Sequence, residues 1–89
     1  MDLKSPEVQT DLTVRLRRIE GQVRGVQRMI ETDRECPDVL QQMAAIRSAV
    51  QQASLLLARA YVASCMRQPA TEDAEVALDR LMSALGRLD

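Results

Sequence analysis

Histidine is absent from this chain, as are tryptophan and phenylalanine, and Tyr61 is the single aromatic residue. The lack of histidine excludes imidazole-ligated zinc, nickel or cobalt sites, Ser-His-Asp triads and histidine acid–base catalysis. Glycine and proline number only three each, too few for the many turns of a β-sandwich or barrel. Because no acid–base pair, phosphate-binding loop or metal triad is evident, we do not expect an enzyme.

The chain also lacks long apolar segments. No run approaches the roughly 20 residues of a membrane span, and the N-terminal stretch MDLKSPEVQ contains no apolar signal core. We therefore expect a cytoplasmic protein with no membrane partner. With 89 residues, the sequence predicts a single domain over 1–89.

Charge is nearly balanced overall, at −1, but it is unevenly distributed. Residues 12–30 contain five arginines against Glu20 alone, a local charge of +4. Residues 69–89 contain five acidic residues against two arginines, a local charge of −3. The basic segment predicts contact with nucleic acid if oligomerisation concentrates it; the alternative is a solvated arginine-rich helix face.

The spacing of apolar residues predicts a first long helix. Ser5 is suited to the N-cap and Pro6 to the first helical position, and the helix should end within 32–35. Gly21 and Gly25 lie on one face and predict a close approach of another helix. The apolar positions, in alternating steps of four and three, are Leu12, Leu16, Ile19, Val23, Val26 and Ile30.

A second long helix is predicted between Pro37 and Pro69, and a short third one follows, with Thr71 as its cap and Gly86 at its end. The second helix continues the four–three spacing through Val39, Met43, Ile46, Val50, Ala53, Leu57, Ala60 and Ser64. The apolar residues of the third are Val76, Leu78, Leu81, Met82 and Leu85.

Together these patterns predict an all-α fold, with two long antiparallel helices and a short C-terminal helix. Two long helices and a short one cannot enclose a compact core alone, so the remaining apolar faces need partners. We expect an obligate homo-oligomer of antiparallel helices. The alternative is a monomeric three-helix bundle, in which the ends of the long helices would remain uncovered.

The two cysteines, Cys36 and Cys65, lie near opposite ends of the predicted second helix. Their separation of 29 residues corresponds to roughly 43 Å along one helix, whereas a disulfide requires Cα atoms within about 7 Å. If two copies of this helix pack antiparallel, a two-fold axis brings Cys36 of one chain towards Cys65 of the other. The alternative is two buried, unreactive core cysteines.

The segment RLRRIEGQVRGVQRMIE at 15–31, followed by Cys36 and by the helix to Cys65, resembles the CsoR/RcnR family of bacterial transcriptional repressors. The resemblance covers essentially the whole chain. It implies a three-helix protomer in a homotetramer, a dimer of dimers, without a conventional helix-turn-helix. It also implies that operator DNA binds to a basic face and is released when an inducer reacts at an inter-subunit cysteine site.

The residues around the cysteines suggest which inducer this chain senses. Copper sensors of the family use two cysteines and a histidine, and the histidine position is here Tyr61. They also tend to carry a tyrosine before the first cysteine and a glutamate on the third helix, where this chain has Glu35 and Arg80. Nickel and cobalt sensors need several histidines.

A two-cysteine site without histidine is similar to the CstR branch, which senses persulfides. We therefore expect a repressor that responds to persulfide or polysulfide through Cys36 and Cys65, with Tyr61 and Glu35 beside the thiols and no resident cofactor or metal. The alternatives are a Cu(I)-responsive repressor that binds the ion with the two thiolates and, less favoured, a purely structural helical adaptor.

Operator DNA is the macromolecular partner that the resemblance implies. An alignment with the family places Arg15 at a basic DNA-contact position, whereas an arginine expected on the second helix is replaced by Gln52. We expect phosphate contacts with strong salt dependence. The predicted contact residues are Arg15, Arg17, Arg18, Arg24, Arg47 and Arg59.

Overall fold

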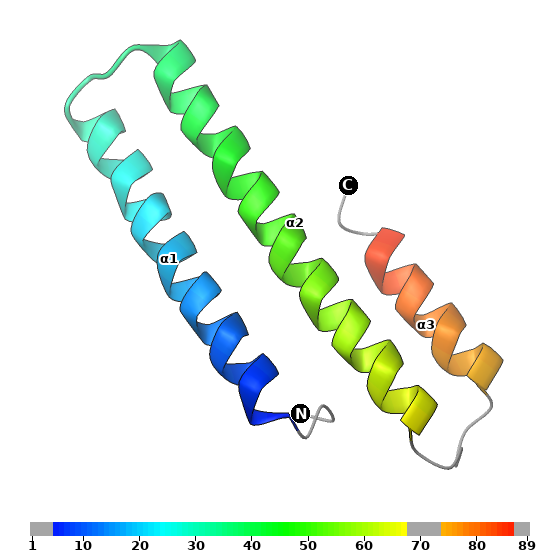
Figure 1. Cartoon of the computed structure of the whole chain (residues 1–89). Coiled ribbons are helices and arrows are strands. Elements are labelled where there is room, and N and C mark those ends of the chain that lie inside the picture. The colour runs from blue at the N-terminus through cyan, green and yellow to red at the C-terminus, as the bar shows by residue number, and fades with distance from the viewer. Residues whose placement is uncertain (1–4, 68–73, 87–89) are drawn as a thin grey trace.

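The computed structural model describes residues 5–67 and 74–86, and every regular element in these ranges is a helix. Helix α1 runs from Pro6 to Glu31, α2 from Cys36 to Arg67 and α3 from Ala74 to Gly86. The first two helices are antiparallel neighbours, and α3 lies along the C-terminal half of α2 (Figure 1). The all-α prediction is confirmed. The predicted cap at position 71 lies outside the described residues.

Helix α1 begins as its sequence predicts. Ser5 has an extended backbone, and its side chain accepts a hydrogen bond from the Val8 amide at 3.4 Å, so it caps the helix. Pro6 occupies the first turn, where its missing N–H removes no helical hydrogen bond. A side-chain cap of this kind typically stabilises a helix by about 1 kcal/mol.

The C-terminus of α1 is closed by two backbone hydrogen bonds that reverse the chain towards α2. The amide of Arg34 donates to the carbonyl of Met29 at 2.9 Å, and that of Asp33 donates to Ile30 at 3.2 Å. This is the Schellman arrangement, which normally has glycine in the left-handed position. Here Asp33 occupies that position with φ of 60°. The helix ends at Glu31, with its cap at Thr32 at the start of the predicted 32–35 segment, and an aspartate follows in a conformation that favours glycine.

The four–three apolar spacing divides into two rows on α1. Leu12 and Val26 are buried and Ile19 is half-buried, and this row faces α2. The residues four positions later remain exposed, Leu16 by 50% and Ile30 by 64% of their surface. One predicted stripe therefore contains a buried row and an exposed row, and only the buried row has a partner within the chain.

The same division occurs on α2. Ala53 is buried and Ile46 is half-buried in the row that faces α1, whereas Met43 and Val50 are exposed. On α1, and on α2 as far as Val50, the exposed row follows the buried row by four residues; beyond Val50, Leu57 is half-buried and Ser64 is buried. Because α1 and α2 run antiparallel, equal offsets place both exposed rows on the same side of the helix pair.

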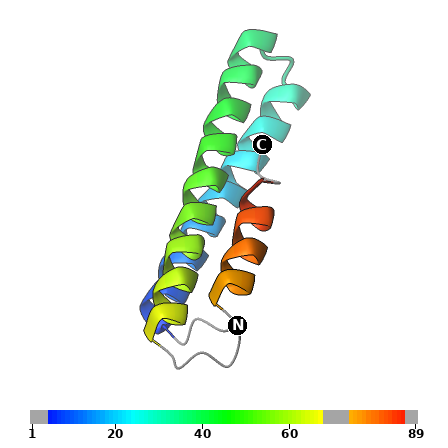
Figure 2. The ribbon, with the colours of Figure 1, turned by 90° about the vertical axis from the view of Figure 1, so that its right-hand side faces the viewer.

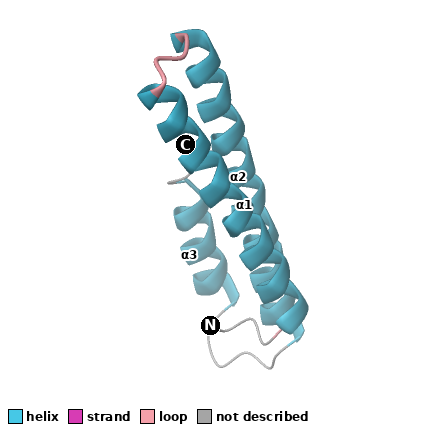
Figure 3. Ribbon diagram, turned by 90° about the vertical axis from the view of Figure 1, so that its left-hand side faces the viewer, coloured by secondary structure: helices cyan, strands magenta, loops and turns pink. Residues whose placement is uncertain are grey.

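The three helices form a thin layer. The Cα atoms extend over 55 × 26 × 13 Å, and their radius of gyration is 16.9 Å, against about 12 Å for a compact domain of this length. Within the described residues, α1 and α3 do not contact each other, and each packs on α2 (Figures 2 and 3). This arrangement is not the compact three-helix bundle considered as an alternative.

The accessible surface also indicates that a single chain is not a compact domain. The chain exposes 7182 Å², whereas a compact monomer of 10.0 kDa exposes about 5,200 Å². The excess, about 1,900 Å², is in the range that one subunit buries in an obligate dimer. No side chain in the described part is fully buried, so the apolar faces lack a complete core within one chain.

The glycines of α1 correct one expectation. A Cβ placed on Gly21 or Gly25 would meet no atom within 4 Å. The close helix approach that their spacing predicts is therefore absent within the chain, because α2 lies against a different face of α1. No helix in the described residues is both long and apolar enough to cross a membrane.

Candidate functional site

The two cysteines lie at opposite ends of one uninterrupted helix. Cys36 is the first residue of α2 and Cys65 lies in its last turn. Since 29 residues are about eight full turns, both lie on the same side of the helix, roughly 43 Å apart. Both thiols are free and exposed in the single chain, so neither belongs to the core between α1 and α2, and a bond within one chain is excluded by distance.

Both thiols belong to the side of the molecule that carries the exposed apolar rows. Cys36 precedes Met43 by seven residues, and Tyr61 and Cys65 follow Leu57 at four-residue steps, which keeps them on one flank of α2. We call this surface the cysteine face. Its members are Leu16, Val23 and Ile30 of α1, and Cys36, Leu40, Met43, Val50, Tyr61 and Cys65 of α2.

The residues one helical turn inside each cysteine are Leu40 and Tyr61. Leu40 is exposed, whereas Tyr61 is half-buried and packs against the Leu12–Ala53 cluster between α1 and α2. Neither side chain is a soft metal ligand, and no group of three or more His, Cys, Asp or Glu side chains that could bind a metal occurs in the described residues. Glu35 is exposed next to Cys36.

The predicted DNA-contact arginines fall on three different surfaces. Arg18 directly precedes Ile19 of the buried row, and Arg59 directly precedes Ala60, so both lie on the side opposite the cysteine face. Arg15 lies three residues after Leu12, on the same side of the molecule as Arg18 and Arg59. We call the surface formed by Arg15, Arg18 and Arg59, with Gln52 one residue before Ala53, the arginine face.

The remaining predicted arginines point elsewhere. Arg17 and Arg24 each lie two residues before a member of the buried row, which places them on the outer edge of α1, away from α2. Arg28 shares this edge, is exposed and forms no ion pair within the described residues. It was missing from the predicted contact residues, although its spacing of four from Arg24 was a sufficient signal. Arg47 follows Met43 by one turn, so it lies on the same side of α2 as the cysteine face.

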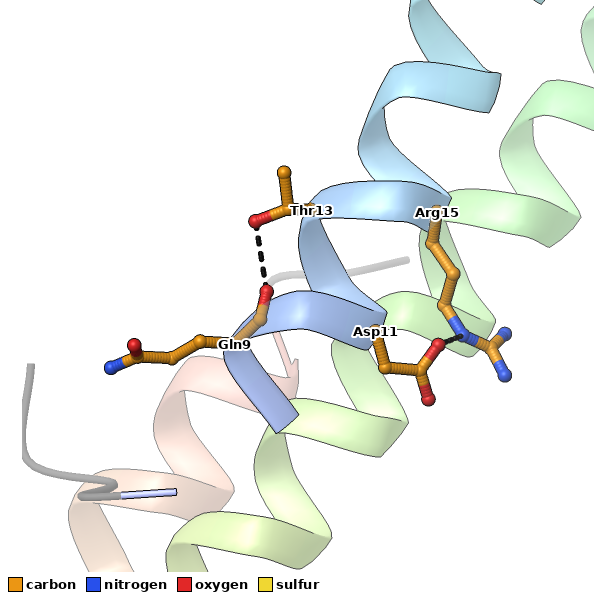
Figure 4. Close-up of polar contacts among 4 residues, drawn as sticks. All are labelled: Gln9, Asp11, Thr13 and Arg15. Carbon is orange, nitrogen blue, oxygen red and sulfur yellow. Dashed lines mark hydrogen bonds and ion pairs between the residues drawn. The ribbon is translucent and has the colours of Figure 1, made fainter. Parts of the chain in front are cut away.

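Two of the six arginines are paired within α1. The Nε of Arg15 donates to Oδ1 of Asp11 at 3.1 Å, with the side chains 40% and 48% exposed (Figure 4). The Nη2 of Arg24 donates to Oε2 of Glu20 at 3.3 Å, between more exposed side chains. Asp11 was not among the predicted site residues, although a carboxylate four residues before an arginine predicts such a pair.

Known proteins match the chain in sequence and structure. A family model described as metal-sensitive transcriptional repressor matches residues 8–87. The copper-sensing transcriptional repressor CsoR of Bacillus subtilis (strain 168) is 39% identical over 80 residues, 89% of this chain and 79% of that protein. The copper-sensing transcriptional repressor RicR of Mycobacterium tuberculosis (strain ATCC 25618 / H37Rv) is 43% identical over 70 residues, 79% of this chain and 73% of that protein.

Among solved structures, the nickel-responsive transcriptional regulator InrS matches with a TM-score of 0.73 and 38% identity, over 90% of this chain and 91% of that chain. These matches confirm the resemblance inferred from the 15–31 segment and the cysteine spacing. The chain therefore belongs to the metal-sensitive transcriptional repressor family, that of CsoR and RcnR, whose members are transcriptional repressors and not enzymes.

Proposed function

We propose that this repressor senses reactive sulfur species through a pair of thiols from two protomers, Cys36 of one and Cys65 of the other. Residues 1–89 would act as one DNA-binding and sensor domain, assembled as a dimer of dimers. The observation that carries the proposal is the position of both exposed thiols on the cysteine face, among apolar residues that need a partner. Family membership gives no support to a structural adaptor.

A second copy of the chain would complete this site by symmetry. Val50 lies midway between the two cysteines along α2. An antiparallel pair of α2 helices that cross near Val50 has a two-fold axis there, and it brings Cys36 of each protomer next to Cys65 of the other. Two equivalent dithiol sites result, each flanked by Leu40 of one chain and Tyr61 of the other.

The proposed sulfur chemistry at such a site takes two steps, sulfur transfer to Cys36 and closure by Cys65. The Cys36 thiolate attacks the sulfane sulfur of a persulfide, RSSH, which forms a Cys36 persulfide and releases the thiolate RS⁻. The Cys65 thiolate of the second protomer then attacks the Cys36 sulfur, forms the disulfide and expels HS⁻. Further sulfur transfer before closure gives tri- or tetrasulfide bridges. The inducer is reduced and the dithiol is oxidised, so no resident cofactor is required.

A Cu(I) sensor is the second candidate, because two relatives are named copper-sensing repressors. Two thiolates can bind Cu(I) in near-linear geometry, so Cys36 and Cys65 fit the ion. The residues next to them do not add a third soft ligand, since Leu40 and Tyr61 occupy the nearest positions on α2. This donor set favours sulfur chemistry over metal binding.

Operator binding is assigned to the arginine face and the outer edge of α1. Arg17, Arg18 and Arg59 are exposed and form no ion pair within the described residues, so their guanidinium groups are free to bind phosphates. Neutralising Arg18 and Arg59 together should weaken operator binding and reduce its salt slope by about 0.9 for each phosphate that the variant no longer neutralises.

Fluorescence anisotropy of operator DNA under anaerobic conditions tests the proposal, with polysulfide or Cu(I) titrated in parallel and intact mass measured on the same samples. We expect polysulfide to release DNA and to produce a covalent dimer, with little response to Cu(I). Cys36→Ser should bind DNA normally and no longer respond to polysulfide. Release by stoichiometric Cu(I) without sulfur addition would instead identify a copper sensor with a two-thiolate site.

A further inference from the structure

The Asp11–Arg15 pair differs from the other ion pair described within α1, Glu20–Arg24, in the nitrogen that it uses. Asp11 accepts from the Nε of Arg15, and the terminal Nη1 and Nη2 form no hydrogen bond within the described residues (Figure 4). In the Glu20–Arg24 pair a terminal nitrogen is engaged, and these side chains are 63% and 71% exposed. Arg15 therefore has both terminal nitrogens free while its Nε is hydrogen-bonded to Asp11. We call these two terminal nitrogens the fork.

We propose that Arg15, oriented by Asp11, reads guanine in the operator, and that the unpaired arginines bind phosphates. This inference rests on the proposed DNA-binding function. Guanine presents two acceptors, O6 and N7, to the major groove, and the two terminal nitrogens of arginine match them. A guanidinium already fixed through Nε loses less conformational entropy when it forms these bonds.

The charge of the pair favours a base edge over a phosphate. Asp11 and Arg15 together are neutral, so the pair adds little to the general attraction of DNA, and its carboxylate repels a nearby phosphate. In the groove the carboxylate is tolerated, because cytosine offers an N4 amino donor beside guanine. Arg17, Arg18 and Arg59 have no such partner in the described residues and retain their full charge for the backbone.

The geometry around Arg15 supports this division of roles. Its side chain is 40% exposed, and its terminal nitrogens form no hydrogen bond within the described residues. Asp11 and Arg15 are one turn apart on α1, a rigid element, so the position of the fork is set by the helix backbone. Bidentate readout of a single base requires such a fixed donor geometry.

The test uses the full chain and a duplex selected by the wild-type protein from a random pool, measured by anisotropy. A second series of duplexes replaces each G·C pair in turn by A·T. Arg15→Lys should weaken binding of the selected duplex roughly 5- to 150-fold and abolish the base preference at one position in each half-site. Its affinity for unrelated duplex DNA should stay nearly unchanged, because the positive charge is retained.

Asp11→Asn provides the sharper measurement, because two affinities should move in opposite directions. Binding to unrelated DNA should tighten, since one negative charge is removed, while the ratio of selected to unrelated affinity should fall about 3- to 10-fold as the fork becomes free to rotate. Glu20→Gln is the matched control, with the same charge change next to Arg24. It should tighten both affinities equally and leave the ratio constant.

The possible outcomes separate this inference from the proposed function. If Asp11→Asn and Glu20→Gln raise both affinities alike, Asp11 is only a surface charge and the orienting role is refuted. If Arg15→Lys keeps the full base preference, Arg15 does not read a base. If the wild-type chain selects no duplex and the Arg18→Ala, Arg59→Ala double variant binds DNA as wild type does, the DNA-binding surface itself is wrong. Circular dichroism verifies that each variant is folded.

Discussion

Val50 is the position at which the proposed assembly can be tested with one substitution. It is exposed in the single chain, it lies on the cysteine face, and it is midway between Cys36 and Cys65 along α2. In an antiparallel pair of α2 helices, the two copies of Val50 meet next to the two-fold axis. A substitution there acts twice in each dimer and changes no thiol.

The expected magnitude of Val50→Asp follows from burial and charge. About 40% of the Val50 surface is available for burial by a second copy, which is worth about 1 kcal/mol for each protomer. A carboxylate in the same place would forfeit several kcal/mol of hydration, and its neighbour across the axis would be a second carboxylate rather than a cation. The combined loss of burial and hydration weakens association by more than about 4 kcal/mol per dimer. The dissociation constant of the dimer should therefore rise by roughly 1,000-fold or more.

Analytical ultracentrifugation over a range of concentrations measures the effect, and intact mass after polysulfide treatment gives a second readout. Ser48→Asp is the control, since Ser48 is exposed and lies about 200° around α2 from Val50. We expect the control to assemble and cross-link as the wild type does, and Val50→Asp to do neither. A Val50→Asp protein that has wild-type mass and cross-links in wild-type yield would refute the antiparallel α2 pairing.

Three further changes test particular residues. Asp33→Gly should raise the free energy of unfolding by about 0.5–1 kcal/mol at fixed protein concentration, because φ of 60° suits glycine, whereas Asp33→Ala should lower it; urea denaturation measures both. Gln22→Met should stabilise the protein by about 1 kcal/mol in the same assay, because Oε1 of Gln22 is buried without a hydrogen bond, and no gain would mean that the oxygen acquires a partner on assembly. Tyr61→His places an imidazole one turn before Cys65 and should tighten Cu(I) binding in a competition titration with a chelator; unchanged affinity would contradict the placement of Tyr61 beside the thiol pair.

The fold could be predicted from the sequence because local signals and periodicity agreed. Ser5 and Pro6 indicated the start of α1, and the segment after Glu31 indicated its end. The four–three spacing identified both long helices. The spacing could not determine which apolar row of each long helix packs against the other helix and which row stays exposed. Contacts within a chain and contacts between chains use the same kinds of apolar side chain.

The candidate site was predictable in composition but not in arrangement. The sequence showed that Cys36 and Cys65 lie too far apart to pair within one helix, but their exposure depends on where α1 packs. The glycine spacing predicted a close approach that α2 does not make. The arginines of 12–30 form one basic segment in the sequence, but the fold divides them between the arginine face and the outer edge of α1, because a change of one residue rotates a side chain by about 100°.

The thin fold explains how chemistry at the cysteine face could control DNA on the opposite face. Helix α2 carries Cys36 and Cys65 on one side and Arg59 on the other, with no second layer between them. In the proposed dimer, a disulfide requires Cα atoms of the two chains within about 7 Å at both ends of the α2 pair, which would restrict how the two α2 helices cross. Any rotation of α2 that satisfies this distance turns Arg59 by the same angle, and α1 moves with it through the Leu12–Ala53 cluster and Tyr61. In the proposed mechanism, a single helix pair therefore acts as sensor and DNA-binding element without a hinge between separate domains.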